Sequence, residues 1–170
     1  MADRHIPTIV IVVTGWLAAV TQVSAQTFVP TGRETLRGLP GIELQLEAFE
    51  PEIERDGLTR AAVQAEIARQ LRDAGIIVYA SQGANPSDAK AYLYVLVNSV
   101  KIPGQDQYAI GLQVDLRQTL RSLVTPINVV DAMTWNQADV IVARTGDLPR
   151  VREVIRGYVD RFIADWKSVH

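Results

Sequence analysis

Cysteine is absent from this sequence, and histidine is nearly so. Without cysteine the chain can form no disulfide, no thiolate metal site, no thiol nucleophile and no covalent haem attachment. The two histidines are His5, close to the N-terminus, and His170, the last residue. A general base or metal ligand built on histidine, or a Ser-His-Asp triad, would have to use a chain end. We therefore predict a protein that holds no metal or other cofactor and is not an enzyme.

An excess of either charge is also missing. Seventeen Lys and Arg residues against nineteen Asp and Glu residues give a formal net charge of −2. Nucleic-acid binding proteins gather basic side chains against phosphates, and this sequence has no basic stripe or polybasic run. The segment Gly38-Leu39-Pro40-Gly41 contains a proline and leads into a strand rather than a helix, which is the wrong context for a phosphate-binding loop. We predict no nucleic-acid partner.

The longest hydrophobic run lies within the first 25 residues. Residues 8–20 are apolar, and Val23-Ser24-Ala25 follows with the small residues of a cleavage site. A membrane span needs about 20 apolar residues, and this run is shorter. We predict a signal peptide over 1–25 and export to the periplasm. The alternative is an uncleaved anchor over residues 6–23, which would tether the domain to the membrane; a cleaved signal would leave no integral membrane span.

Past the signal, residues 26–38 are polar, contain Pro30 and Gly32 and show no periodicity, so we predict a flexible linker followed by one domain over 39–170. Residues 42–48 alternate between apolar and polar, which predicts a half-buried strand. Thr59 fits the N-cap of a helix that runs to residue 74, with Gly75 as its C′ residue. A second strand over 76–79 makes a strand–helix–strand unit, which favours parallel strands joined by a right-handed crossover.

Two long strands follow. Residues 91–101 are apolar on both faces, as in a central strand, and residues 107–118 alternate. Pro103-Gly104 suits a type II turn, so these strands form an antiparallel hairpin. Residues 121–126 indicate another turn and 127–135 a further strand, whereas 136–146 could be an edge strand or a packed loop.

The C-terminal segment has the clearest helical pattern. Asp147 precedes Leu148-Pro149 as a cap, and apolar residues then recur at helical spacing to Trp166. The pairs Arg156–Asp160 and Arg161–Asp165 are four residues apart and could support the helix. The predicted order β-α-β-β-β-β-α gives an α+β fold: a two-layer sandwich with a mostly antiparallel sheet of four to five strands and two helices on one face.

This architecture leaves one face of the sheet open. Its expected polar lining is Glu43, Gln45, Glu47, Gln113, Asp115 and Arg117. Tyr92 and Tyr94 join that face if the aliphatic residues between them face the helices. Tyrosine offers a large contact area with a polar tip. The candidate interaction surface is therefore Tyr92, Tyr94, Gln113, Asp115 and Arg117, although a tyrosine pair can also simply cover a bare sheet.

Other residues carry weaker functional signals. Glu43 and Glu47 share a strand face and could form the carboxylate pair of a glycosidase, but a solvated sheet face is the favoured interpretation. Asp56 and Asp147 lack the acid pattern of a calcium loop, which favours turn and cap roles. Trp135 and Trp166 are expected in packing rather than in a sugar platform.

Four segments carry a family resemblance. They are GLTRAAVQAEIARQLRDAGIIV, the hairpin AYLYVLVNSV/QYAIGLQVDLRQ, Thr134-Trp135 and the closing VREVIRGYVDRFIADW. Together they resemble small exported bacterial envelope domains, such as the N-terminal α/β domain of the Tol-Pal propeller protein and outer-membrane auxiliary lipoproteins. The resemblance is one of pattern. It implies an accessory or assembly role in the envelope and transfers no site residues.

The sequence thus predicts a non-enzymatic periplasmic module that binds envelope proteins. A second hypothesis is a small-ligand carrier or sensor with a pocket between sheet and helices. A third is a carboxylate-dependent hydrolase of envelope glycans that uses Glu43 and Glu47.

Overall fold

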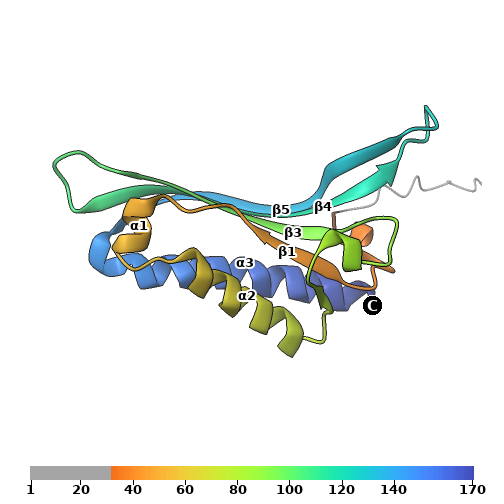
Figure 1. The fold of residues 1–170 in the computed structure, drawn as a ribbon, viewed down its shortest axis with the longest axis horizontal. Coiled ribbons are helices and arrows are strands. Elements are labelled where there is room, and N and C mark those ends of the chain that lie inside the picture. The colour runs from red at the N-terminus through yellow and green to blue at the C-terminus, as the bar shows by residue number, and fades with distance from the viewer. Residues whose placement is uncertain (1–31) are drawn as a thin grey trace, which may run out of the picture.

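The structure, a computed structural model, describes residues 32–170 as two layers, a five-stranded sheet with helices on one face (Figure 1). The predicted signal peptide and the first part of the predicted linker lie outside the described residues. The strands are β1 (Ile42–Leu46), β2 (Val78–Tyr79), β3 (Tyr92–Lys101), β4 (Gln107–Arg121) and β5 (Asn128–Arg144). Their order in the sheet is β2-β1-β3-β4-β5. β1 is parallel to β2 and to β3, and the longer β3–β4 and β4–β5 pairings are antiparallel. The predicted α+β sandwich is confirmed.

The helices are α1 (Pro51–Arg55), α2 (Arg60–Asp73) and α3 (Leu148–Val169), with short 3₁₀ turns η1 (Gly32–Leu36), η2 (Gln82–Ala84) and η3 (Thr145–Asp147). α2 begins as predicted, because the Thr59 hydroxyl accepts a hydrogen bond from the Ala62 amide. It ends before Gly75, whose φ of +86° is the left-handed conformation that glycine adopts without strain. None of the helices in the described part of the chain is long and apolar enough to cross a membrane.

Two elements differ from the sequence prediction. α1 is a helical turn that the sequence analysis did not predict, and it starts at Pro51, whose fixed φ suits a first helical position. The segment 136–146, which the sequence left between an edge strand and a loop, is mostly the second half of β5, a single strand of 17 residues. This half lacked a clear alternation of polar and apolar residues, because the helix-facing Gln137 and Asp139 are polar and bonded to α3, whereas the outward-facing Val140 and Val142 are apolar.

The end of the predicted linker belongs to the domain. Leu36 of η1 is fully buried, and the Gln118 side chain donates hydrogen bonds to the Thr35 carbonyl (3.3 Å) and to the Thr134 hydroxyl (2.8 Å). Gln118 thus joins η1 to the β4–β5 ladder. Its polarity in a strand gave no signal of this internal role.

The core lies between the sheet and the helices. Leu93, Val95 and Val97 of β3 point into it, and α3 contributes the buried residues Leu148, Val151, Ile155, Tyr158, Val159, Phe162 and Trp166. Because side chains alternate along a strand, Tyr92 and Tyr94 lie on the opposite, uncovered face. Hereafter this face, without helices over it in Figure 1, is the open face.

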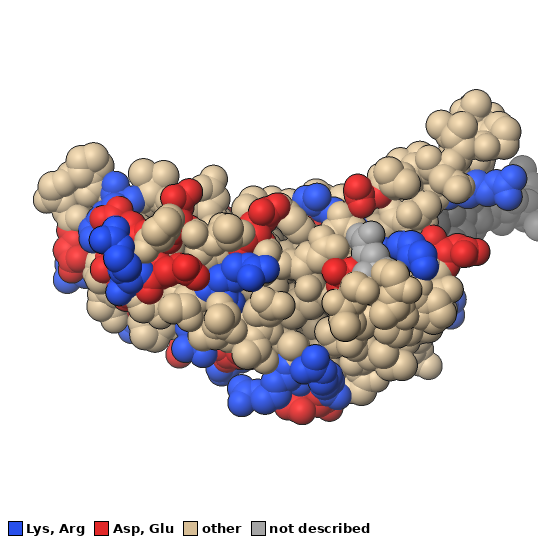
Figure 2. Space-filling model, viewed as in Figure 1, with Lys and Arg blue, Asp and Glu red and all other residues tan. Residues whose placement is uncertain are grey.

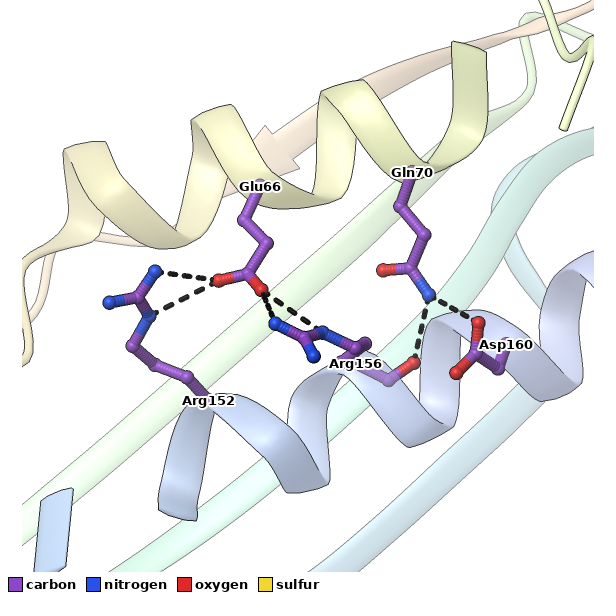
Figure 3. A network of polar contacts seen from close by, with 5 residues as sticks. All are labelled: Glu66, Gln70, Arg152, Arg156 and Asp160. Carbon is purple, nitrogen blue, oxygen red and sulfur yellow. Dashed lines mark hydrogen bonds and ion pairs between the residues drawn. The ribbon is translucent and has the colours of Figure 1, made fainter. Parts of the chain in front are cut away.

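A polar lock holds α2 against α3 (Figure 3). The Glu66 carboxylate accepts hydrogen bonds from Arg152 and Arg156, and the Gln70 amide donates to Asp160 (2.6 Å). The hydrogen bond from Arg156 is the main cause that lowers the pKa of Glu66, against the opposing effect of burial. The predicted pairing of Arg156 with Asp160 along α3 was wrong, because both side chains are used between helices.

The second predicted pair along α3 is replaced in the same way. Arg161 donates to the Gln137 side chain (2.7 Å), and Asp165 accepts a hydrogen bond from the Trp135 indole (2.8 Å). Both contacts join α3 to β5. Tertiary partners thus take over charges that the sequence placed in local helical pairs.

The β4–β5 hairpin extends past the body of the sheet and bends away from the helices (Figure 1). Its pairing shifts register between Leu116 and Arg117 and again between Gln118 and Leu120. Asp131 lies in this bend with a φ of +55°, a left-handed conformation that aspartate tolerates better than most residues. Bulges of this kind bend a strand pair. We call residues 118–130, which project past the bend, the arm.

Candidate functional site

The open face gathers all five residues of the predicted interaction surface. Tyr92 pairs with Arg117 across β3 and β4, and Tyr94 pairs with Asp115. Gln113 is the next residue of β4 on the same face. The alternation that placed these residues together in the sequence is therefore preserved in the sheet, because no bulge interrupts the pairing of β3 with β4.

Asp115 is the centre of this group. One carboxylate oxygen, Oδ2, accepts hydrogen bonds from the Gln113 amide (2.7 Å) and from the Arg117 guanidinium (3.2 Å). The guanidinium also lies over the Tyr94 ring, 4.0 Å from its centroid, a cation–π arrangement. The Asp115 side chain is completely buried although it lies on the open face. Its negative charge is balanced by Arg117, which shields it from solvent together with the tyrosine.

Each tyrosine hydroxyl is fixed by an acid. Tyr94 donates to Glu47 of the segment after β1 (2.6 Å), and Tyr92 donates to Asp131 at the root of the arm (2.9 Å). Burial, reinforced by the hydrogen bond to Glu47, raises the pKa of Tyr94 to about 12. The same two causes, with Asp131 as acceptor, raise the pKa of Tyr92. Both phenols therefore stay protonated donors at neutral pH.

Accessibility divides the five residues into two groups. Tyr92 and Asp115 are buried, whereas Tyr94, Gln113 and Arg117 are half-buried and reach solvent. A partner on the open face would touch the half-buried Tyr94, Gln113 and Arg117. The buried Tyr92 and Asp115 would hold these side chains in position. We call Tyr94, Gln113, Asp115 and Arg117 the polar cluster.

An apolar hollow of about 330 Å³ adjoins the polar cluster and shares Gln113 with it. The hollow is lined by Leu96, Asn98, Gly111, Leu112, Gln113, Ala138, Asp139 and Val140. Gly111 lies between Asn98 and Val140 in the ladder and has no side chain to fill the space. A Cβ there would meet the Asn98 carbonyl at 3.8 Å, an ordinary contact, so the backbone does not require a glycine. In Figure 2 the upper outline of the molecule, along the open face, is concave between the β3–β4 turn and the arm.

Sequence reasoning missed this hollow, although two signals for it were present. Leu96 continues the alternation of Tyr92 and Tyr94 along β3, and Gly111 interrupts the polar side of β4. Val140 lines the hollow from β5. It lies in the segment 136–146, for which the sequence analysis gave both an edge strand and a packed loop. Val140 is 80% exposed. Together with the exposed Val100 and Val142 it makes this part of the open face apolar.

The other candidate residues have structural contacts. Trp135 packs edge-on against Phe162, with ring centroids 5.2 Å apart, and Trp166 is buried beside them. The His170 ring stacks on Trp166 at 4.4 Å, so this chain end is held against the body. Glu47 is engaged by Tyr94 rather than paired with Glu43. Within residues 32–170, no three His, Cys, Asp or Glu side chains gather as a metal site.

On the helix side, two polar hollows of about 290 and 310 Å³ lie at the outer surface of α2 and α3, around Glu66 and Arg69. The gap between α2 and α3, lined by Val63, Ile67 and Ile155 among others, holds about 10 Å³.

At the end of α1, Asp56 accepts hydrogen bonds from Tyr108 (2.6 Å) and Lys101 (3.0 Å). These two bonds lower the pKa of Asp56, the one from Tyr108 most. They join the end of α1 to the β3–β4 hairpin.

No family model matches this chain, and no curated protein matches it.

Proposed function

We propose that the chain is a non-enzymatic module of the bacterial envelope that binds a protein partner through its open face. The observation that carries the proposal is the pairing, on that one face, of an apolar hollow with a polar cluster whose side chains are already fixed by hydrogen bonds. Apolar contact beside oriented polar groups is the general composition of a protein interface. Fixed side chains also reduce the entropy lost on binding.

The remaining features support a location and a role. The signal-like start of the sequence favours export, and the pattern of the four segments described above favours an accessory or assembly role. The helix side supports this choice of face, because its core is packed and its polar side chains are engaged between α2 and α3. An envelope protein partner on the open face is consistent with each of these features.

Site-specific crosslinking in living cells tests the proposal. A photoreactive amino acid replaces Val140 at the rim of the hollow, and a matched control replaces Glu153, an exposed residue of α3. We expect a discrete crosslinked product from position 140 and none from position 153. Adding Gly111→Leu, which fills the hollow, should remove the product. Equal products at both positions, or none at either, would contradict the proposal.

A small apolar ligand in the hollow is the second candidate. Its volume of about 330 Å³ is at the lower limit of ligand sites, and Asn98 and Gln113 provide hydrogen-bonding groups at its walls. The hollow supports a ligand site on the open face, whereas the sequence suggested one between sheet and helices. A rise in melting temperature with one compound of a metabolite panel, abolished by Gly111→Leu, would favour this function over the first.

A further inference from the structure

The arm carries a dense group of exposed apolar side chains. Leu123 and Val124 at its tip are almost completely exposed, and neighbouring apolar residues are partly so: Leu120, Ile127, Val129 and Val130. No acidic residue occurs in the arm, and Arg121 is its one charged residue. Exposed apolar patches of this density mark surfaces that bind a protein or a membrane.

The arm is a built element rather than a slack loop. The Ser122 amide donates to the Ile127 carbonyl (3.0 Å), and the Ser122 hydroxyl accepts from the amides of Val124 and Thr125 (3.3 Å each). At the root, Gln118 and Asp131 are held by η1 and Tyr92 respectively. Much of the tip backbone is therefore hydrogen-bonded internally, as an apolar surrounding requires.

Apolar residues occur on both faces of the arm. Val129 and Val130 are consecutive in β5 and so point to opposite faces, and both are exposed. Leu120 pairs with Val129 on one face, and the other face combines Val130 with the polar pair Arg121–Asn128. The tip residues Leu123 and Val124 are exposed on all sides, which suits a surrounding without direction better than a single docking face. Lipid acyl chains are such a surrounding. The basic Arg121 next to the tip complements lipid phosphates, and its long side chain can reach them from an inserted tip.

The start of the described chain lies at the root of the arm. A Cβ on Gly32 would be 2.7 Å from the Thr134 carbonyl oxygen of β5. The apolar run 8–20 precedes Gly32 by twelve residues, which span at most about 45 Å when fully extended. If that run stays in the membrane, the arm is within reach of the bilayer. If it is removed, the arm itself supplies an apolar contact.

We propose that the arm inserts its tip, residues 122–127, into the interface of a lipid bilayer. The outer edges of the arm lack strand partners among the described residues, which limits insertion to the headgroup and upper acyl region. This proposal concerns another surface than the open face and does not depend on the proposed protein partner.

The absence of cysteine makes a local test possible. Leu123→Cys in the full chain is labelled with an environment-sensitive fluorophore, and Val140→Cys, also an exposed apolar residue of the hairpin but outside the arm, is the matched control. Vesicles are pure phosphatidylcholine or contain added phosphatidylglycerol. We expect a several-fold rise and a blue shift of emission at position 123 with either vesicle, and no change at position 140. The label at 123 reports on the arm even where residues 8–20 also bind lipid.

Two further variants sharpen the result. Val124→Asp in the labelled Leu123→Cys chain should abolish the rise, and Arg121→Gln should remove only the added effect of the anionic lipid. No response at 123 with either vesicle, or an equal response at 140, would overturn the proposal. A blue shift that grows with protein concentration in the absence of vesicles would also overturn it, because a second copy would then cover the tip.

Discussion

The two faces of this sheet come from the same alternating strands and yet use polar side chains in opposite ways. On the helix side, apolar residues of β3 meet α3, and the polar residues of α2 and α3 tie the helices together across their outer surface. On the open face, the charged Asp115 is buried, while Val140 and Val142 are exposed. An open face thus need not be a polar face, because side chains can cover one another without a second layer.

The largest effect is expected on the helix side of the sheet, when a large buried aromatic side chain is truncated. Phe162→Ala should cost about 3–5 kcal/mol of unfolding free energy, because Phe162 is fully buried between Trp135 and Trp166. The open-face control Val140→Ala should change it by less than about 0.5 kcal/mol. Urea unfolding of both variants measures the contrast. Similar costs would mean that the open face is packed in solution.

The next largest change in unfolding free energy is expected from the buried Asp115 carboxylate of the open face. Arg117→Ala should cost about 3 kcal/mol, because it leaves the buried Asp115 carboxylate without its cation. In an Asp115→Asn background the same change should cost much less, since no charge is then left unpaired. A double-mutant cycle by urea unfolding gives this coupling. Additive costs would show that the two side chains act independently.

The polar lock between α2 and α3 should contribute less to the free energy of unfolding, and its contribution should depend on pH. Its carboxylate lies between two partly exposed arginines, so solvent screening limits the effect of Glu66→Gln to about 1 kcal/mol at pH 7. The pKa of Glu66 is lowered in the folded state. Its stabilisation is therefore present above the unfolded value of about 4.5 and is lost as the pH falls through the folded pKa. In thermal unfolding from pH 7 to pH 3, the difference in melting temperature between the two proteins should become smaller as the pH falls.

The smallest effect is expected for the Tyr94 hydroxyl. Tyr94→Phe keeps the ring under Arg117 and removes the hydrogen bond to Glu47, at a cost of about 0.5–1 kcal/mol. The folded pKa of about 12 lies above the ordinary value of 10, so this difference is present below pH 10 and is lost as the pH rises towards 12. Ultraviolet titration of the phenols should show one fewer late-ionising group in the variant.

Local pattern was sufficient for most of the fold. The alternation of β1 and β4, the apolar run of β3, the Thr59 cap and the Pro103-Gly104 turn each depend on neighbouring residues, and each is found where predicted. The turn is closed by the Gln105 amide on the Ile102 carbonyl (3.0 Å), and Gly104 has the positive φ that its position requires. Exceptions occur where tertiary contacts decide the structure, as in η1 and in the second half of β5.

The candidate site could be predicted only in part. Alternation placed Tyr92, Tyr94, Gln113, Asp115 and Arg117 on one face, but it could not show that Asp115 is covered by its neighbours. The hollow at Gly111 needs residues from three strands, and their register follows from the pairing rather than from any one strand. The arm needs the bulges near Leu116 and Gln118, which have no distinct sequence signature.

The sequence by itself determined the composition of each strand face, the helix boundaries near Thr59 and Pro149, and the exclusion of thiol chemistry, because these depend on residue type and local spacing. Only the tertiary structure decided which charges are buried, which valines reach solvent and where the hairpin leaves the body. Burial and register are properties of several segments at once, since a side chain is covered or exposed by whatever the rest of the chain brings next to it.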